Sequence, residues 1–213
     1  ALLLETFYLI AIVAASPNVD KAPESVANTF TTLPRGTQPQ PPQPLIEGDS
    51  SSQVRVVAYE DLQCPDCAVY RRMMDEKLLP AYRDKVAFEH RDFPLPRHTW
   101  ARKAAIAARF FQELKPDVAV EYRRHTLANF KHTTPENFKD RLAEFAKTQG
   151  VDPARALAAL DEPRFNDIVE KDYQDGVARG VSKTPTVFVN GQPFVETFTV
   201  EEISKAIEAE LKR

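Results

Sequence analysis

The sequence VRVVAYEDLQCPDC occupies residues 54–67 and joins a strand pattern to a Cys-x-x-Cys motif. The β-branched and aromatic side chains of residues 54–59 are typical of a buried strand. Pro65 follows the first cysteine, and proline is favoured at the first position of a helix, which apolar spacing then continues to about residue 79. An alternating run over 86–93 predicts a second strand, so the pattern indicates a right-handed parallel βαβ unit.

The chain beyond residue 95 reads as a block of helices and then returns to a strand pattern. Apolar residues at helical spacing predict several helices, one of them capped by Thr134. Two short apolar runs flank Asn190-Gly191, which is the strongest short-range signal for a hairpin. We therefore predict an α/β domain interrupted by an all-helical insertion, with the first half at 53–95, the insertion at 96–174 and the second half at 175–213.

The first 52 residues differ in composition from the rest of the chain. Residues 1–15 carry one charged residue, Glu5, and form a shorter apolar segment than the roughly 20 residues that span a bilayer. They are typical of a signal peptide or of the remnant of a membrane anchor, with a buried helix as the alternative. Residues 16–52 hold seven of the 17 prolines, so we predict a proline-rich linker.

Charge and cysteine content exclude several classes of protein. The 28 basic and 31 acidic residues leave a net charge of -3, which gives no general electrostatic reason to bind nucleic acid or anionic lipid. Two cysteines exclude an all-cysteine zinc module and a scaffold held by several disulfides. A mixed zinc site would need histidines, whose spacing does not fit, and a purely structural disulfide across two residues would constrain the unfolded chain little.

The position of the two cysteines favours redox chemistry. Cys64 is expected at the N-terminus of a helix, where unpaired backbone N–H groups and the helix dipole stabilise a thiolate. Cys67 lies about one turn further along the same face. The expected division of labour is that Cys64 exchanges with the substrate sulfur and Cys67 resolves the mixed disulfide.

Three segments together resemble the DsbA family of thiol-disulfide oxidoreductases: residues 56–67, 90–98 and 180–191. The resemblance covers about residues 53–213 and implies a thioredoxin fold with an inserted helical domain. It further implies that Pro185 follows a cis bond and faces the cysteine pair, and that the Thr184 backbone pairs with an extended substrate segment. Composition alone would favour an ordinary trans bond.

The dipeptide between the cysteines departs from that family, because this chain has Pro65-Asp66 where the best-known oxidases have Pro-His. A carboxylate on Asp66 opposes formation of the Cys64 thiolate. We therefore expect the pKa of Cys64 toward the upper end of the range of roughly 3.5 to 7.5 seen in such motifs, and a weaker oxidant than the Pro-His enzymes.

The sequence leaves more than one candidate for the residue that accepts the Cys67 proton. Family members often carry a buried acid six residues before the first cysteine, where this chain has Ala58. Glu60 and Asp61 are the candidates for a proton relay in its place. His90 is interpreted as a structural residue of a strand, and His98 as the start of the next helix.

The resemblance implies an exported protein disulfide oxidoreductase, periplasmic or otherwise extracytoplasmic, that oxidises dithiols of unfolded proteins and is released from or tethered to a membrane. No metal or diffusible cofactor is expected, because the electrons reside in the Cys64-Cys67 disulfide. The implied partners are unfolded or cysteine-containing exported proteins and a quinone-linked membrane protein of the DsbB or vitamin K epoxide reductase type. The alternatives are a disulfide reductase or isomerase, a non-catalytic binding protein or chaperone, and an interaction module acting through Pro39–Pro44.

Overall fold

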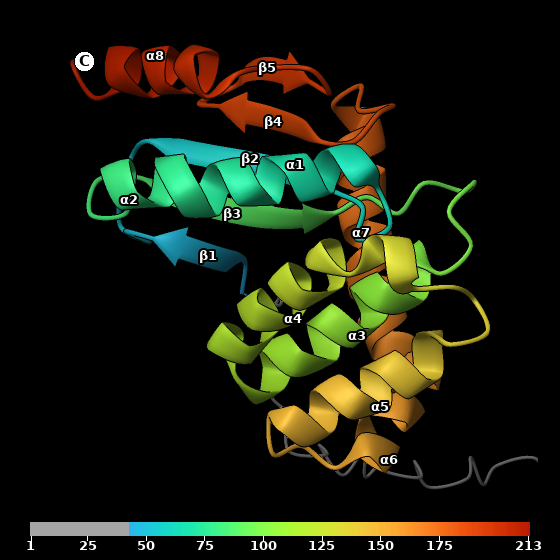
Figure 1. The fold of residues 1–213 in the computed structure, drawn as a ribbon. Helices are drawn as coiled ribbons and strands as arrows, with labels where there is room; N and C mark the ends of the chain where they lie inside the picture. The colour runs from blue at the N-terminus through green and yellow to red at the C-terminus, as the bar shows by residue number, and fades with distance from the viewer. Residues whose placement is uncertain (1–42) are drawn as a thin grey trace, which may run out of the picture. The chain divides into compact units, whose positions relative to one another are not determined.

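The centre of the computed structural model, which describes residues 43–213, is a five-stranded mixed sheet (Figure 1). β2 and β3 are parallel and the helix Pro65–Met73 lies between them in the sequence, while the other neighbouring strands are antiparallel. This arrangement contains the predicted βαβ unit and confirms the α/β class. The strands, in the spatial order β1-β3-β2-β4-β5, are β1 (Leu45–Gly48), β2 (Arg55–Glu60), β3 (Ala87–Asp92), β4 (Thr186–Val189) and β5 (Gln192–Val195).

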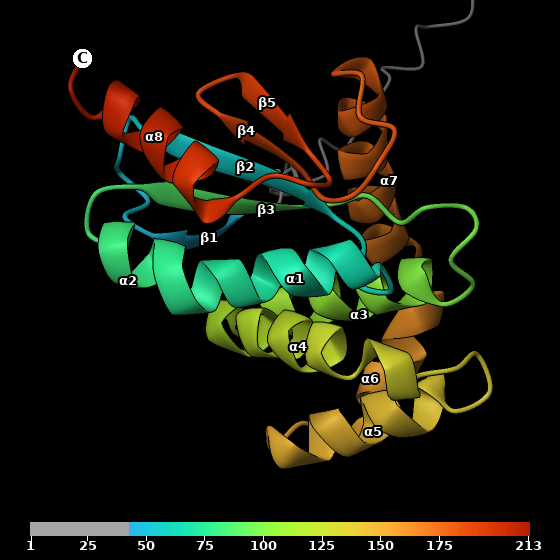
Figure 2. The same cartoon turned by 45° about the horizontal axis from the view of Figure 1, so that its top comes forward.

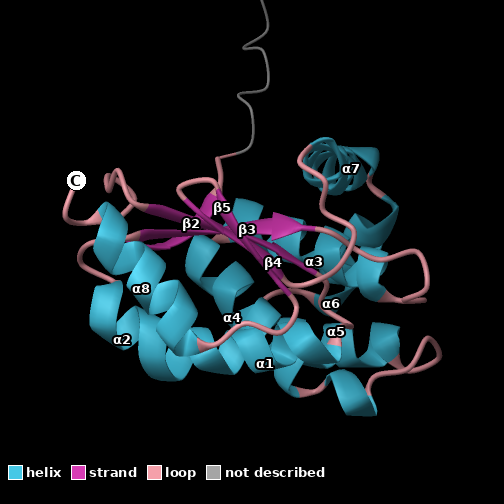
Figure 3. Cartoon of the chain, turned by 90° about the horizontal axis from the view of Figure 1, so that it is seen from above, coloured by secondary structure: helices cyan, strands magenta, loops and turns pink. Residues whose placement is uncertain are grey.

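Helices cover both faces of the sheet. α1 and α8 lie on one face, and α7 lies against the other (Figures 2 and 3). The helices are α1 (Pro65–Met73), α2 (Leu79–Tyr82), α3 (Ala101–Leu114), α4 (Pro116–Ala128), α5 (Phe138–Thr148), α6 (Pro153–Ala158), α7 (Pro163–Ala178) and α8 (Val200–Glu210). Short turns of other helix types are η1 (Met74–Leu78), η2 (Phe130–His132) and η3 (Ala159–Asp161).

The alternation of β2 divides its side chains between two cores. Val56 and Ala58 point to the face that packs against α1 and α8, whereas Tyr59 points to the opposite face. There Tyr59 meets Phe93 edge-on, and Phe93 stacks on Tyr173 of α7 with ring centroids 4.6 Å apart. Both faces of the central strand are thus buried, as its near-continuous apolar pattern predicts.

A third core lies within the helical insertion and includes the cysteines. Aromatic rings of α3, α4, α5 and α7 pack together at its centre. Cys64 and Cys67 belong to the same buried cluster. The insertion therefore packs directly against the first turn of α1 and supplies part of the environment of both sulfur atoms.

The proline-rich linker predicted over residues 16–52 extends too far toward the C-terminus. Leu45–Gly48 forms strand β1, which pairs antiparallel with β3, and Leu45 is 2% exposed. An apolar pair directly after the prolines is enough to anchor an edge strand, because β3 offers it a free row of backbone hydrogen bonds. The predicted signal or anchor segment at 1–15 and the linker up to residue 42 lie outside the described residues.

The helical insertion and the second half of the domain are joined by one unbroken helix. α7 passes through the boundary predicted between residues 174 and 175, because its last turns pack on the sheet.

The starts of two other helices also differ from prediction. α5 begins at Phe138, because Thr134 and Asn137 bond each other's backbone N–H groups and close a turn first. His98 lies in the loop before α3 instead of starting it. Among residues 43–213, no helix is both long and apolar enough to cross a bilayer.

Substituting Gly176 with alanine is expected to destabilise the domain by about 1–3 kcal/mol. A Cβ atom at this position would lie 2.6 Å from Cδ2 of Phe93 and 3.0 Å from Cδ1 of Tyr59, so two buried rings would have to move. Urea unfolding measures the effect. The control is Val177→Ala on the adjacent, exposed position, which should change stability little. Equal stability of the two variants would contradict the close packing of α7 on the sheet.

Candidate active site

The two cysteines lie at the start of α1, after the short loop that follows β2. Cys64 is the N-cap residue, Pro65 is the first helical residue, and the Cys64 carbonyl accepts the N–H of Ala68 at 3.2 Å. Both cysteines are free thiols, with 2% and 0% of their surfaces exposed. Because the positive end of the helix dipole points at Cys64, this position favours a thiolate.

The two thiols have opposite proton affinities. The hydrogen bond with the Cys67 side chain is the largest influence that lowers the pKa of Cys64 to about 6, inside the range expected from the sequence. Burial, followed by the hydrogen bond and charge of Cys64, raises the pKa of Cys67 well above its ordinary value. At neutral pH the negative charge therefore resides on Cys64 and the proton on Cys67.

The loop before β4 brings a distant part of the chain to Cys64. The Thr184–Pro185 peptide bond is cis, and the Cys64 thiol donates to the Thr184 carbonyl at 3.2 Å across 120 positions of sequence. The Thr184 hydroxyl is buried and, within the described part of the chain, has no conventional hydrogen-bond partner. The Thr184 side chain is also among the groups that lower the pKa of Cys64.

Asp66 acts on Cys64 differently from the expectation. Its backbone N–H helps to lower the pKa of Cys64, and its carboxylate is not among the main influences on that pKa. The Asp66 side chain is exposed, as is that of Pro65, so water screens its charge. The opposing effect predicted for this carboxylate is therefore small.

The two candidate relay acids are both buried but point to different surroundings. Asp61 accepts the backbone N–H groups of Gln63 and Leu95, each at 2.7 Å, and contacts His98 Nδ1 at 2.7 Å. Its own backbone N–H donates to the Cys67 sulfur at 3.3 Å. Burial raises the pKa of Asp61 although these donors oppose the effect. The Asp61 carboxylate thus fixes the loop before α3. The contact of Asp61 with Cys67 is made by its backbone N–H and not by the carboxylate.

Glu60 lies on the face of β2 that packs against α1. Its carboxylate contacts His90 Nδ1 at 2.7 Å and Arg123 Nη2 at 3.4 Å. Burial works to raise the pKa of Glu60, but the charge and hydrogen bond of His90, together with the charges of Arg123 and Arg71, outweigh it and hold that pKa below its usual value. The Glu60 charge in turn helps to raise the pKa of Cys67.

Two residues near this site were not identified as functional candidates from the sequence. His90 is buried in β3 and does have a structural pairing, but its partners are Glu60 and Glu47, both acidic. Glu47 was assigned to the linker. The only local signal for it was the apolar pair Leu45-Ile46 just before it, which indicates a short strand.

A small groove with both apolar and acidic lining residues adjoins the exposed side of the cysteine motif. It has a volume of about 140 Å³ and lies between α1 and the turn after β5, with Val69 on its α1 wall 48% exposed. Its lining includes Asp66, Met73 and Phe198. Within residues 43–213, no three His, Cys, Asp or Glu side chains are grouped so that they could hold a metal ion.

Comparisons with known proteins agree with this geometry. The Thioredoxin family model matches residues 40–209. The chain is 28% identical over 166 residues to the Na(+)/H(+) antiporter NhaA of Herminiimonas arsenicoxydans, which covers 77% of this chain but 25% of the antiporter. It is 27% identical over 173 residues to disulfide bond formation protein D of Bacillus subtilis (strain 168), covering 80% of this chain and 78% of that protein. The chain therefore spans about a quarter of one relative and most of the other.

The crystal structure of Wolbachia pipientis alpha-DsbA1 superimposes with a TM-score of 0.71 at 16% identity, covering 80% of this chain and 92% of that chain. At this identity the similarity establishes the fold. The thioredoxin fold with a helical insertion, expected from the sequence, is confirmed.

The Cys64 pKa depends on the Thr184 side chain, so Thr184→Val should raise it by about one. The thiolate absorbance in the ultraviolet reports this pKa during a pH titration of the reduced protein. Thr186→Val is the matched control, because that hydroxyl donates to the Lys183 carbonyl at 2.7 Å and does not influence Cys64. An unchanged Cys64 pKa in Thr184→Val would refute the role of the side chain.

The lowered pKa of Cys64 also makes stability depend on pH in the reduced protein. The thiol titrates near 9.0 when unfolded and at about 6 when folded, so its contribution is fully present above pH 9 and is lost as the pH falls through 6. The unfolding free energy of the reduced protein, relative to the disulfide form, should therefore increase from pH 6 to 9. Urea unfolding of both forms measures this, and a flat difference would contradict it.

Proposed function

This chain belongs to the thioredoxin family, and from that premise we propose that it is a DsbA-type thiol-disulfide oxidoreductase that oxidises dithiols of unfolded proteins. The observation that carries the proposal is the pair of sulfurs with opposite proton affinities at the start of α1. Disulfide exchange needs a thiolate that attacks or leaves readily and a second thiol that resolves the intermediate. Cys64 and Cys67 fit these two roles.

The proposed reaction starts from the Cys64–Cys67 disulfide. A client thiolate attacks the Cys64 sulfur, a client–Cys64 bond forms, and Cys67 leaves as a thiolate that takes up a proton. The second client thiolate then attacks the client sulfur of this mixed disulfide, which releases Cys64 as a thiolate and completes the client disulfide. Because Cys64 is a stable thiolate, the reduced form is favoured and the protein acts as an oxidant.

Glu60 is the proposed proton donor and acceptor for Cys67. Its charge already acts on Cys67, whereas the Asp61 carboxylate is held by three donors on the side of the loop before α3. Asp61 keeps a positioning role through its backbone N–H, which donates to the Cys67 sulfur. Pro65 and Asp66 shape the start of the helix and present its N–H groups to Cys64.

Client recognition is proposed to combine backbone pairing with a weak apolar contact. Thr184 lies beside Cys64, so an extended client segment pairing with the Thr184–Pro185 loop would bring its cysteine to the reactive sulfur. The groove at Val69 and Met73 has room for one apolar side chain next to that segment. Such a site selects unfolded chains and is indifferent to most of their sequence.

The two electrons taken from a client reside on the cysteine pair, so the proposal includes no metal or diffusible cofactor. Reoxidation is assigned to a quinone-linked membrane protein of the DsbB or vitamin K epoxide reductase type. Oxidation of exported clients places the domain outside the cytoplasm, with residues 1–15 as export signal or anchor and the prolines that follow as a tether.

The equilibrium reduction potential in glutathione buffers at neutral pH tests the proposal. We expect a value well above the thioredoxin level of about -270 mV, toward about -120 mV. Cys67→Ala, mixed with oxidised glutathione, should accumulate the Cys64–glutathione mixed disulfide, because Cys64 displaces one glutathione as a thiolate and the protein has no second thiol to resolve the product.

Cys64→Ser is the control and should form no mixed disulfide at all. A potential at or below the thioredoxin level would contradict an oxidase and indicate a reductase. A disulfide that a mild dithiol reduces only slowly would instead indicate a non-catalytic protein of the same fold.

A further inference from the structure

Hydrogen bonds through one histidine connect the surroundings of Cys67 with the edge strand β1. His90 Nδ1 lies 2.7 Å from Glu60 Oε2, and His90 Nε2 lies 2.9 Å from Glu47 Oε1. The three residues lie on β2, β3 and β1, so the connection crosses neighbouring strands on one face of the sheet. The reaction proposed above uses only Glu60 of the three.

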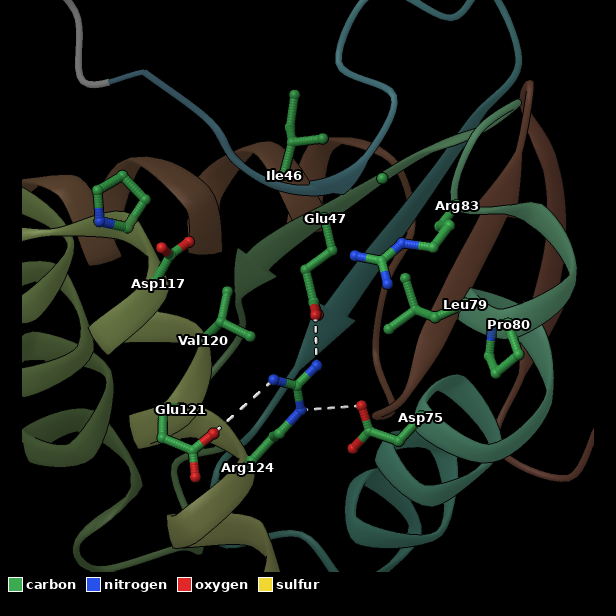
Figure 4. Close-up of a pocket in the computed structure, with 12 residues that line it drawn as sticks. Ile46, Glu47, Asp75, Leu79, Pro80, Arg83, Asp117, Val120, Glu121 and Arg124 are labelled. Carbon is green, nitrogen blue, oxygen red and sulfur yellow. Dashed lines mark hydrogen bonds and ion pairs between the residues drawn. The ribbon is translucent and has the colours of Figure 1, made fainter.

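The two glutamates at the ends of this connection differ in their access to solvent. Glu60 is 2% exposed. The Glu47 side chain is 11% exposed and lines a groove of about 730 Å³ between β1, α2 and α4. There it also bonds Arg71 at 2.5 Å and Arg124 at 2.6 Å, and Figure 4 shows its carboxylate pointing at the Arg124 guanidinium. Glu47 is therefore held from three sides.

Charged and titratable groups from several elements lie near His90. They are Glu47 from β1, Glu60 from β2, Asp92 from β3, Tyr70 and Arg71 from α1, Arg109 from α3, and Arg123 and Arg124 from α4. Among residues 43–213, only the two glutamates form hydrogen bonds with the imidazole, while the arginines bind carboxylates. Burial works to lower the pKa of His90, but the adjacent carboxylates outweigh it and raise that pKa above its usual value.

We propose that Glu47 is a positioning residue of the redox site. By accepting the Nε2–H of His90, it keeps the imidazole charged and its Nδ1–H directed at Glu60, so that Glu60 stays ionised and its charge acts on Cys67. This inference rests on the proposed function, because the state of Glu60 matters only if Cys67 exchanges a proton during the reaction.

The step that depends on Glu47 is resolution of a mixed disulfide by Cys67. The Cys67 S–H bond breaks, Glu60 takes the proton, and the sulfur electron pair forms the bond to Cys64. The partner sulfur leaves with the electron pair of the broken disulfide. In the opposite direction, Cys67 leaves as a thiolate and the same proton returns from Glu60.

Glu47 could affect the pKa of Glu60 either through His90 or directly through its own negative charge. Removing the Glu47 charge distinguishes these two cases, because they shift the Glu60 pKa in opposite directions. If Glu47 acted only by its own charge, its loss would leave Glu60 with one anionic neighbour fewer and lower the pKa of Glu60. If Glu47 acts by holding His90, its loss lets the imidazole give up its proton more easily. Glu60 then loses the nearer of its two cationic partners and keeps only Arg123 at 3.4 Å, so its pKa rises.

Glu47→Gln is the decisive variant, read out in two ways. Nitrogen NMR of the His90 ring should show deprotonation at a pH lower by about one or more than in the wild type. Quench-flow of the reduced protein with oxidised glutathione gives the rate at which Cys67 resolves the Cys64–glutathione disulfide. The acidic midpoint of this pH profile, which reports ionisation of Glu60 as the proton acceptor, should move up by about one pH unit, while the Cys64 pKa stays unchanged.

Asp75→Asn is the matched control, because Asp75 lines the same groove and binds Arg71 and Arg124 but does not contact His90. It should leave both readouts as in the wild type. An unchanged or lowered midpoint in Glu47→Gln overturns the proposal. A neutral His90 ring in the wild type at pH 7 also overturns it, and this measurement does not require the variant to fold. If the wild type fails to exchange with glutathione, the proposed function is wrong. The pH at which the His90 ring loses its proton, measured by NMR, still tests the Glu47–His90 contact in that case.

Discussion

Asp92 is the buried charge on which the docking of the helical insertion depends. Its carboxylate accepts from Arg109 of α3 at 2.5 Å and from Arg123 of α4 at 2.7 Å, and its backbone N–H donates to Asp172 of α7 at 3.1 Å. Removing one partner from such a buried set leaves an uncompensated charge, at a cost of roughly 3–5 kcal/mol. The insertion therefore keeps one orientation on the sheet, because any rotation would separate these groups.

That orientation makes the first turn of α1 asymmetric. The core of the insertion continues into Cys64, Cys67 and Ala68, so the helix is dry on the side of Cys67. On the other side, Pro65 and Asp66 are exposed. Burial disfavours the thiolate of Cys67, whereas the helix N-terminus favours that of Cys64. Two thiols three residues apart thus acquire different chemistry from the same helix.

Much of this could be predicted from local sequence pattern, and the remainder depends on contacts between distant segments. β2 follows from its run of β-branched and aromatic residues, α1 from proline at the helix start, and β3 from alternation. β1 did not, since four residues after a proline run pair only because β3 lies beside them. Alternation could place His90 inside the sheet but could not name Glu47 as its partner, 43 positions earlier. Gly176 suggests a weak point in a helix by propensity. Its real role, close contact with Phe93, is visible only once α7 is docked on the sheet.

The contact between Cys64 and Thr184 joins residues 120 positions apart, which has a consequence for how the protein is made. A ribosome adds about 5–20 residues per second, so Cys64 is synthesised on the order of ten seconds before Thr184. Throughout that interval the growing chain has its cysteine motif but lacks Thr184, which helps to lower the pKa of Cys64. Until Thr184 has been added, the polypeptide carries a dithiol that other oxidants can oxidise, and Cys64 gains its full acidity only after the Thr184 loop has folded against it.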